Sequence, residues 1–145
     1  MAQAQKFFTK AEERLILDAI REAESNTSGE IRLHVENRCK KDVLDRAAEV
    51  FNLLKMQKTK LRNGVLFYLA INDRKFAILG DAGINAKVPD DFWDQIKEQL
   101  LLRFKKSEFA EGLAEAIVKA GEQLKTHFKH ESDDVNELSD DISYG

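Results

Sequence analysis

The chain has 145 residues, of which 23 are basic, 26 are acidic and 43% are hydrophobic, and its formal net charge is −3. This length and apolar content suit one domain with an ordinary core, so a second domain is not expected. The near balance of charges argues against a nucleic-acid-binding protein.

The compartment is predicted from what the sequence lacks. Its single cysteine, Cys39, excludes an internal disulfide and is typical of a reducing compartment. The first residues have no apolar core of signal-peptide length, and no run approaches the roughly 20 apolar residues that span a bilayer. We therefore expect a cytoplasmic protein that does not associate with a membrane.

The first predicted elements are a helix and a strand. Thr9, followed three residues later by Glu12, has the form of a capping box and predicts a helix over residues 10–24. Apolar residues then alternate with polar ones over residues 31–36, which predicts a strand at the periphery of the sheet. Its polar face, which includes His34, is expected to be exposed to water.

The middle of the chain predicts the core of the sheet. Asp42 suits the N-cap of a second helix, whose apolar stripe reaches toward Met56. Val65–Ile71 is an unbroken apolar run, typical of a strand covered on both faces. Turn residues at 72–74 and a second strand near residues 76–78 complete an antiparallel hairpin. We expect a right-handed βαβ crossover with the apolar strand between the other two.

Two helices follow the hairpin. Pro89 suits a first helical position, and Asp90 and Asp91 would lie in the first turn, where negative charge is favourable. Ser107 is expected to cap a last helix that ends near Phe128. The predicted class is α/β: a three-layer α/β/α sandwich with a small mixed sheet and helices on both faces.

The last residues differ from the rest of the chain. Residues 129–145 contain six acids and one lysine, whereas residues 1–128 form the expected α/β domain. Such a polar segment is predicted to be disordered. The alternative is a docking segment, anchored by its four apolar residues, Val135, Leu138, Ile142 and Tyr144.

Three segments resemble one family. Within residues 62–80, Asn-Gly-Val-Leu-Phe-Tyr-Leu-Ala is followed by Asn-Asp-Arg-Lys, which resembles the TPM-domain family. Thr-Ser-Gly-Glu-Ile at 27–31 is similar to the start of the family's first strand, and residues 104–113 to its turn between the last two helices. The resemblance extends to about residue 128 and implies an α/β/α sandwich. Members of the family include thylakoid-lumen acid-phosphatase-like proteins.

Two departures from the family pattern lie close to its expected site. The family commonly has an acid immediately before the Asn-Gly pair, and this chain has Arg62. Its Gly-Tyr-Gly-Leu-Glu-Gly-like loop is replaced by residues 80–87, which lack the glutamate but keep two glycines and contain Asp81.

Strand direction predicts where a ligand would bind. The start of the second strand and the end of the third should meet at one edge of the sheet. The candidate phosphate or ligand residues there are Arg62, Asn63, Gly80, Asp81 and Gly83. Oxygens of Asp81, Asp90 and Asp91 would suit Ca²⁺ or Mg²⁺, which could bridge to a phosphate.

Two functions compete. The first is a non-catalytic protein-interaction module that binds a partner through the loop edge or the acidic tail. The alternative is a low-activity, divalent-metal-assisted phosphomonoester hydrolase of the acid-phosphatase type, implied by the resemblance. No nucleophile is recognisable and the histidines show no triad or metal spacing, so no catalytic residue is assigned. The missing acid before Asn63 favours the first function.

Overall fold

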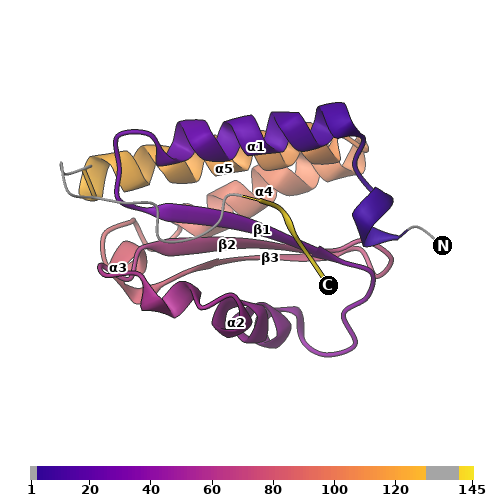
Figure 1. Cartoon of the computed structure of the whole chain (residues 1–145), viewed down its shortest axis with the longest axis horizontal. Coiled ribbons are helices and arrows are strands. Elements are labelled where there is room, and N and C mark those ends of the chain that lie inside the picture. The colour runs from indigo at the N-terminus through magenta and orange to yellow at the C-terminus, as the bar shows by residue number, and fades with distance from the viewer. Residues whose placement is uncertain (1–2, 130–140) are drawn as a thin grey trace.

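The computed structural model describes residues 3–129 and 141–145 (Figure 1). Two short 3₁₀ turns, five helices and four strands occur in these ranges. In chain order they are η1 (Ala4–Lys6), α1 (Lys10–Glu24), β1 (Glu30–Glu36), α2 (Val43–Leu53), η2 (Met56–Lys58), β2 (Gly64–Ala70), β3 (Lys75–Gly80), α3 (Ala82–Asn85), α4 (Phe92–Lys105), α5 (Phe109–His127) and β4 (Ser143–Tyr144).

The strands form one mixed sheet between two layers of helices. The strand order is β3-β2-β1-β4; β1 is parallel to both β2 and β4, whereas β2 and β3 are antiparallel. Helices α1, α4 and α5 cover one face of the sheet and α2 covers the other (Figure 1). The predicted α/β class and mixed sheet are confirmed, with β2 between β1 and β3.

Local signals in the sequence set several helix starts. The Thr9 hydroxyl accepts from the Glu12 amide, and the Glu12 carboxylate accepts from the Thr9 amide, so the predicted capping box is present. Asp42 accepts from the amides of Leu44 and Asp45 at the start of α2. The seven residues of β2 are all buried, as the apolar run predicts.

The prediction for β1 was wrong. All of its residues except Arg32 are buried, and the strand lies inside the sheet rather than at its periphery. His34 is 6% exposed and Glu36 is 5% exposed. The alternation of polar residues predicts a water-exposed face, but in the structure His34 and Glu36 bond to each other beneath α2.

Two other predictions of local structure differ from the structure. Helix α4 begins at Phe92, so Asp90 and Asp91 precede it instead of forming its first turn. Ser107 does not cap α5, because its φ of 59° is in the left-handed region and its amide still closes the end of α4 on the Phe104 carbonyl. Glu108 occupies the N-cap position.

The end of the chain joins the body. Ser143 and Tyr144 form β4 against β1, and Ile142 and Tyr144 pack on the main core. For these residues the docking alternative describes the structure better than disorder does. The other two proposed anchors, Val135 and Leu138, lie outside the described residues. No helix in the described ranges is both long enough and apolar enough to cross a membrane.

Candidate functional site

The predicted ligand edge lies where β2 begins and β3 ends. Val65 pairs with Gly80, and the amide of Asp81 donates to the carbonyl of Gly64 at 2.9 Å. This register brings Asn63 and Asp81 to the same end of the sheet, as strand direction requires. The predicted ligand residues thus come from two adjoining segments: Arg62 and Asn63 on one, and Gly80, Asp81 and Gly83 on the other.

Arg62 and Asp81 form a two-pronged ion pair at this edge. Arg62 Nε lies 2.7 Å from Asp81 Oδ2, and Arg62 Nη2 lies 2.8 Å from Asp81 Oδ1. The hydrogen bonds and charge of Asp81 raise the pKa of the guanidinium. Oδ1 also accepts from the Ala82 amide at 2.7 Å, at the start of α3. Both carboxylate oxygens are therefore engaged by groups of the protein.

Asn63 joins the beginnings of the two parallel strands. It is 1% exposed, its Nδ2 donates to Ser28 Oγ at 3.2 Å, and its carbonyl accepts from the Glu30 amide at 3.4 Å. Within the described residues its buried Oδ1 has no hydrogen-bond partner. These contacts give Asn63 a structural role between β1 and β2.

The two glycines are required by close packing. A Cβ at Gly83 would lie 2.1 Å from the carbonyl oxygen of Leu61, and one at Gly80 would lie 2.8 Å from a ring carbon of Trp93. The Gly83 amide donates to the Arg62 carbonyl at 2.7 Å. The Gly83 amide is therefore bonded to the turn that precedes β2 and is not presented to a phosphate.

The predicted metal ligands are not gathered around one point. Asp90 and Asp91 are exposed residues before α4, and Asp91 accepts from Gln95 Nε2 at 2.7 Å. Among residues 3–129 and 141–145, no three His, Cys, Asp or Glu side chains are placed to hold a metal ion. An ion that used Asp81 would have to replace the Arg62 guanidinium. The Ca²⁺ or Mg²⁺ site stays a prediction.

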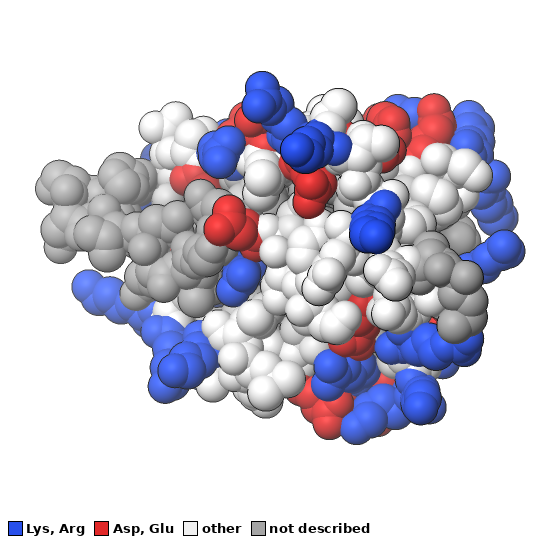
Figure 2. Space-filling model, turned by 45° about the vertical axis from the view of Figure 1, so that its right-hand side comes forward, with Lys and Arg blue, Asp and Glu red and all other residues white. Residues whose placement is uncertain are grey.

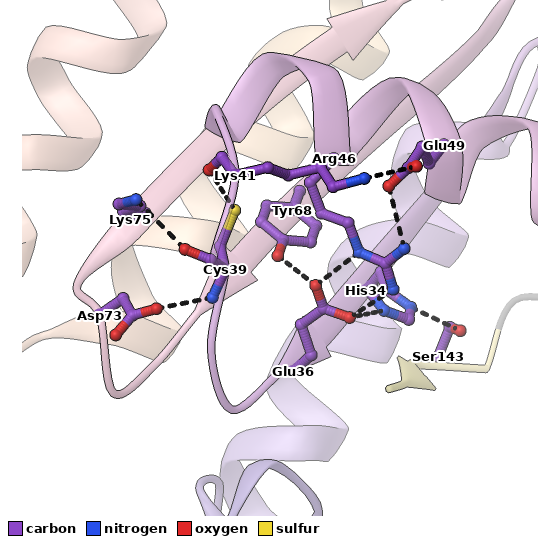
Figure 3. Close-up of polar contacts among 10 residues, drawn as sticks. All are labelled: His34, Glu36, Cys39, Lys41, Arg46, Glu49, Tyr68, Asp73, Lys75 and Ser143. Carbon is purple, nitrogen blue, oxygen red and sulfur yellow. Dashed lines mark hydrogen bonds and ion pairs between the residues drawn. The ribbon is translucent and has the colours of Figure 1, made fainter.

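A second polar site was not predicted from the sequence. It comprises His34, Glu36, Arg46, Tyr68 and Ser143, called here the polar cluster, and Figure 3 shows these side chains converging between the sheet and α2. Two of them come from β1, and the others come from α2, β2 and β4. In the ladder between the parallel strands, His34 is opposite Tyr68.

Glu36 is at the centre of the polar cluster. Arg46 donates to its two carboxylate oxygens, from Nε at 2.9 Å and from Nη2 at 3.0 Å. The Tyr68 hydroxyl donates to Oε2, and His34 Nε2 lies 3.1 Å from Oε1. The other ring nitrogen of His34 lies 2.8 Å from Ser143 Oγ. The carboxylate therefore connects β1, α2 and β2, and the His34 ring extends the connection to β4.

The pKa values in the polar cluster follow from burial and from these bonds. Burial alone would raise the pKa of Glu36, but hydrogen bonds from Arg46, Tyr68 and His34 outweigh it and lower the value to about 2. Burial lowers the pKa of His34, in spite of its bond to Glu36. Burial, with the Glu36 hydrogen bond, raises the pKa of Tyr68. At neutral pH the cluster holds a carboxylate, a neutral imidazole and a phenol.

This arrangement positions elements rather than providing a reactive group. Both Glu36 oxygens are occupied and its charge is balanced by Arg46, while the His34 ring is hydrogen-bonded at both nitrogens. The sequence does contain a signal for it, since His34 and Glu36 point to one face of a strand with an apolar opposite face. Without knowledge of α2, the same pattern predicts solvent exposure.

Cys39 lies beside the polar cluster and is 3% exposed. Its amide donates to Asp73 Oδ2 at 2.7 Å, and its thiol donates to the Lys41 carbonyl at 3.1 Å. A buried thiol held in this way is a structural residue.

A sequence model of the TPM domain matches residues 1–123. The chain belongs to the TPM-domain family. The BA42 protein from the psychrophilic bacterium Bizionia argentinensis has 50% identity to this TPM domain, a TM-score of 0.90 and coverage of 100% of both chains.

Two more distant solved structures share the fold of this TPM domain. The N-terminal domain of a P. gingivalis protein has 19% identity and a TM-score of 0.73, with 87% of this chain and 83% of that chain covered. The N-terminal domain of a Corynebacterium glutamicum protein has 13% identity and a TM-score of 0.65, with 81% and 74% covered. No curated protein matches the sequence.

Proposed function

We propose that this TPM domain is a non-catalytic protein-interaction module that binds a partner protein through its loop edge. The Arg62–Asp81 ion pair is the observation that carries the proposal. Asp81 is the acid that the loop supplies, and its oxygens already accept from Arg62 and from an amide. A metal ion could bind this carboxylate only by displacing those donors, which disfavours a metal site here.

The groups that the loop edge exposes are apolar and basic. Leu61 is 48% exposed, and the Arg62 side chain is 53% exposed beyond its contact with Asp81. Residues 55–62 include four basic residues and no acidic one. An exposed leucine within a basic stretch of sequence fits an acidic partner surface with an apolar centre, where the leucine supplies affinity and the charges supply steering.

The test is photo-crosslinking from position 61 in the cell of origin. A photoreactive residue at position 61 should capture a partner with an acidic surface, and added Leu61→Glu protein should not compete for that partner. Leu102→Glu is the matched control, because Leu102 on α4 is 61% exposed. Equal competition by Leu61→Glu and Leu102→Glu protein would reject the loop edge as the binding surface.

The alternative proposal is divalent-metal-assisted hydrolysis of phosphomonoesters, and family membership is what supports it. In this proposal Asp81, Asp90 and Asp91 hold Ca²⁺ or Mg²⁺, and Asn63 orients the phosphate. Arg62 would have to leave Asp81, and its exposed guanidinium could then bind the phosphate oxygens.

A pair of variants separates the two proposals. If Asp81 is a metal ligand, Arg62→Gln should tighten binding of Ca²⁺ or Mg²⁺, because it frees the carboxylate, and Asp81→Asn should abolish binding. Amide shift titration reports the affinity and the position, and release of p-nitrophenol from p-nitrophenyl phosphate reports hydrolysis. Shifts and hydrolysis that are unchanged in both variants would exclude a metal site at Asp81.

A further inference from the structure

Among the residues that the structure describes, strand β1 is paired unequally on its two sides. All seven of its residues pair with β2, whereas β4 pairs with His34 and Val35. The amide of Gly145 extends this short ladder by donating to the Val35 carbonyl at 3.0 Å. A short extended segment added to the edge of a sheet is the geometry by which many proteins bind peptides.

The side chains of the added segment alternate between the two faces of the sheet. Ile142 and Tyr144 pack toward α1, where the Tyr144 hydroxyl donates to Glu13 Oε2 at 2.7 Å. Ser143 points the other way and meets the His34 ring at 2.8 Å (Figure 3). The edge of β1 thus provides three successive side-chain positions, which suit an aliphatic residue, a small residue with a hydroxyl group and an aromatic residue.

The next position is selective for glycine. A Cβ at Gly145 would lie 2.5 Å from Glu36 Oε1 and 2.8 Å from His34 Nε2. Both atoms are held by the hydrogen bonds of the polar cluster and cannot readily move aside. The cluster that positions β1, β2 and α2 therefore also forms one wall of this site.

The other wall of the site is basic. A groove of about 520 Å³ lies between α1 and the segment, lined by Lys10, Glu13, Arg14, Leu17, Arg21, Asp141, Ile142 and Tyr144. Its α1 side contributes three cations and one acid. Arg32 also donates to the Asp141 carbonyl at 3.2 Å. Figure 2 shows this side of the molecule, where charged side chains surround a largely uncharged centre. Cations beside the groove residues Leu17, Ile142 and Tyr144 favour an acidic peptide with apolar anchors.

We propose that the β1 edge is a strand-addition site for an extended acidic peptide of a partner protein. The peptide carries an aliphatic residue, Ser or Thr, an aromatic residue and glycine in succession. Residues 141–145 are the competitor within the chain that this peptide displaces. The site lies on the opposite side of β1 from β2 and β3, so the proposal does not depend on the loop edge.

Competition from residues 141–145 lowers the apparent affinity of the β1 edge for a partner peptide. The segment has two ladder pairs and anchors that are only half-buried, and ordering it costs backbone entropy. Its covalent attachment keeps it at a high effective concentration near β1. A partner peptide therefore binds only the fraction of molecules in which the segment has left the edge.

The experiment uses the full-length chain and a fluorescent peptide with the sequence of residues 131–145. Tyr144→Ser in the chain should weaken the internal competitor and tighten binding of the peptide by about 10-fold. Leu102→Ser, at an exposed leucine on α4, is the control and should leave the affinity unchanged. A peptide in which the residues equivalent to Ile142 and Tyr144 are serine keeps the same charge and should not bind.

The proposal is overturned if neither the wild type nor Tyr144→Ser binds the peptide, or if the serine-substituted peptide binds equally well. Amide exchange in the wild type gives a readout that does not require the variant to fold. A saturating amount of peptide should expose the Gly145 amide of the chain to exchange, while β2 stays protected. An unchanged exchange rate for Gly145 at saturation would also overturn the proposal.

Discussion

Glu36 shows how one residue can determine the arrangement of several elements. Its carboxylate accepts hydrogen bonds from α2 through Arg46, from β2 through Tyr68 and from its own strand through His34. Burying a charge is costly unless it is paired and hydrogen-bonded, and these contacts meet that condition. Loss of the charge should therefore weaken the attachment of α2 to the sheet.

Acid should reveal this contribution. The pKa of Glu36 is about 2 in the folded protein and 4.5 ordinarily, a difference that corresponds to about 3 kcal/mol of folding free energy. Because the folded-state value is depressed, the stabilisation is full above pH 4.5 and is lost as the pH falls toward about 2. Urea unfolding of wild type and Glu36→Gln across this range measures it. The two stability curves should converge at low pH, and parallel curves would contradict the assignment.

At the scale of the elements, the sequence predicts what depends on local chemistry or on a continuous pattern. The capping box at Thr9 and the apolar run of β2 are of this kind, and the structure has both. The surroundings of β1 cannot be predicted in this way. Alternating polar residues give the same sequence pattern whether that face of the strand is exposed to water or covered by α2. The polar cluster also requires Arg46, which lies on α2 and is brought to Glu36 by the tertiary fold.

Strand β2 offers a test of the covered sheet. Leu69 is 4% exposed, so Leu69→Asp should destabilise the protein by roughly 3 kcal/mol or more, because an unpaired charge would enter the core. Leu53→Asp is the matched control, since Leu53 at the end of α2 is 70% exposed. Chemical denaturation compares the two variants, and similar losses would argue against burial of β2.

Packing between α1 and α5 offers a second test. A Cβ at Gly121 would lie 2.5 Å from Ala23 Cβ and 2.6 Å from Ala23 Cα. Gly121→Ala should therefore destabilise by about 1–3 kcal/mol, although alanine is the better helix former. Glu122→Ala, at the exposed next residue, should have little effect on the thermal midpoint. A rise in the midpoint of Gly121→Ala would mean that the helices lie further apart.

Across the whole molecule, family resemblance and periodicity were enough to predict the layers, but not the two sites in detail. The loop edge was located from strand direction, yet the Arg62–Asp81 pair depends on a side-chain geometry that spacing does not encode. The end of the chain was expected to be disordered because its composition is acidic. Its last residues nevertheless pair with β1 and hydrogen-bond to α1. No local sequence pattern specifies these contacts.

Removal of residues 141–145 tests the part that these residues play in the complete fold. A chain that ends at residue 140 would lose the pairing of β4 with β1, the packing of Ile142 and the bond from Tyr144 to Glu13. We expect the free energy of unfolding to fall by about 1–2 kcal/mol, because two half-buried apolar side chains and a short ladder are lost while the entropy of ordering the segment is recovered. Urea denaturation measures the loss, with Tyr144→Phe as the milder control.

The truncated chain should also be more prone to dimerise through the uncovered edge of β1, which light scattering detects. An unchanged free energy of unfolding and unchanged light scattering would instead support the disordered tail that composition alone predicts.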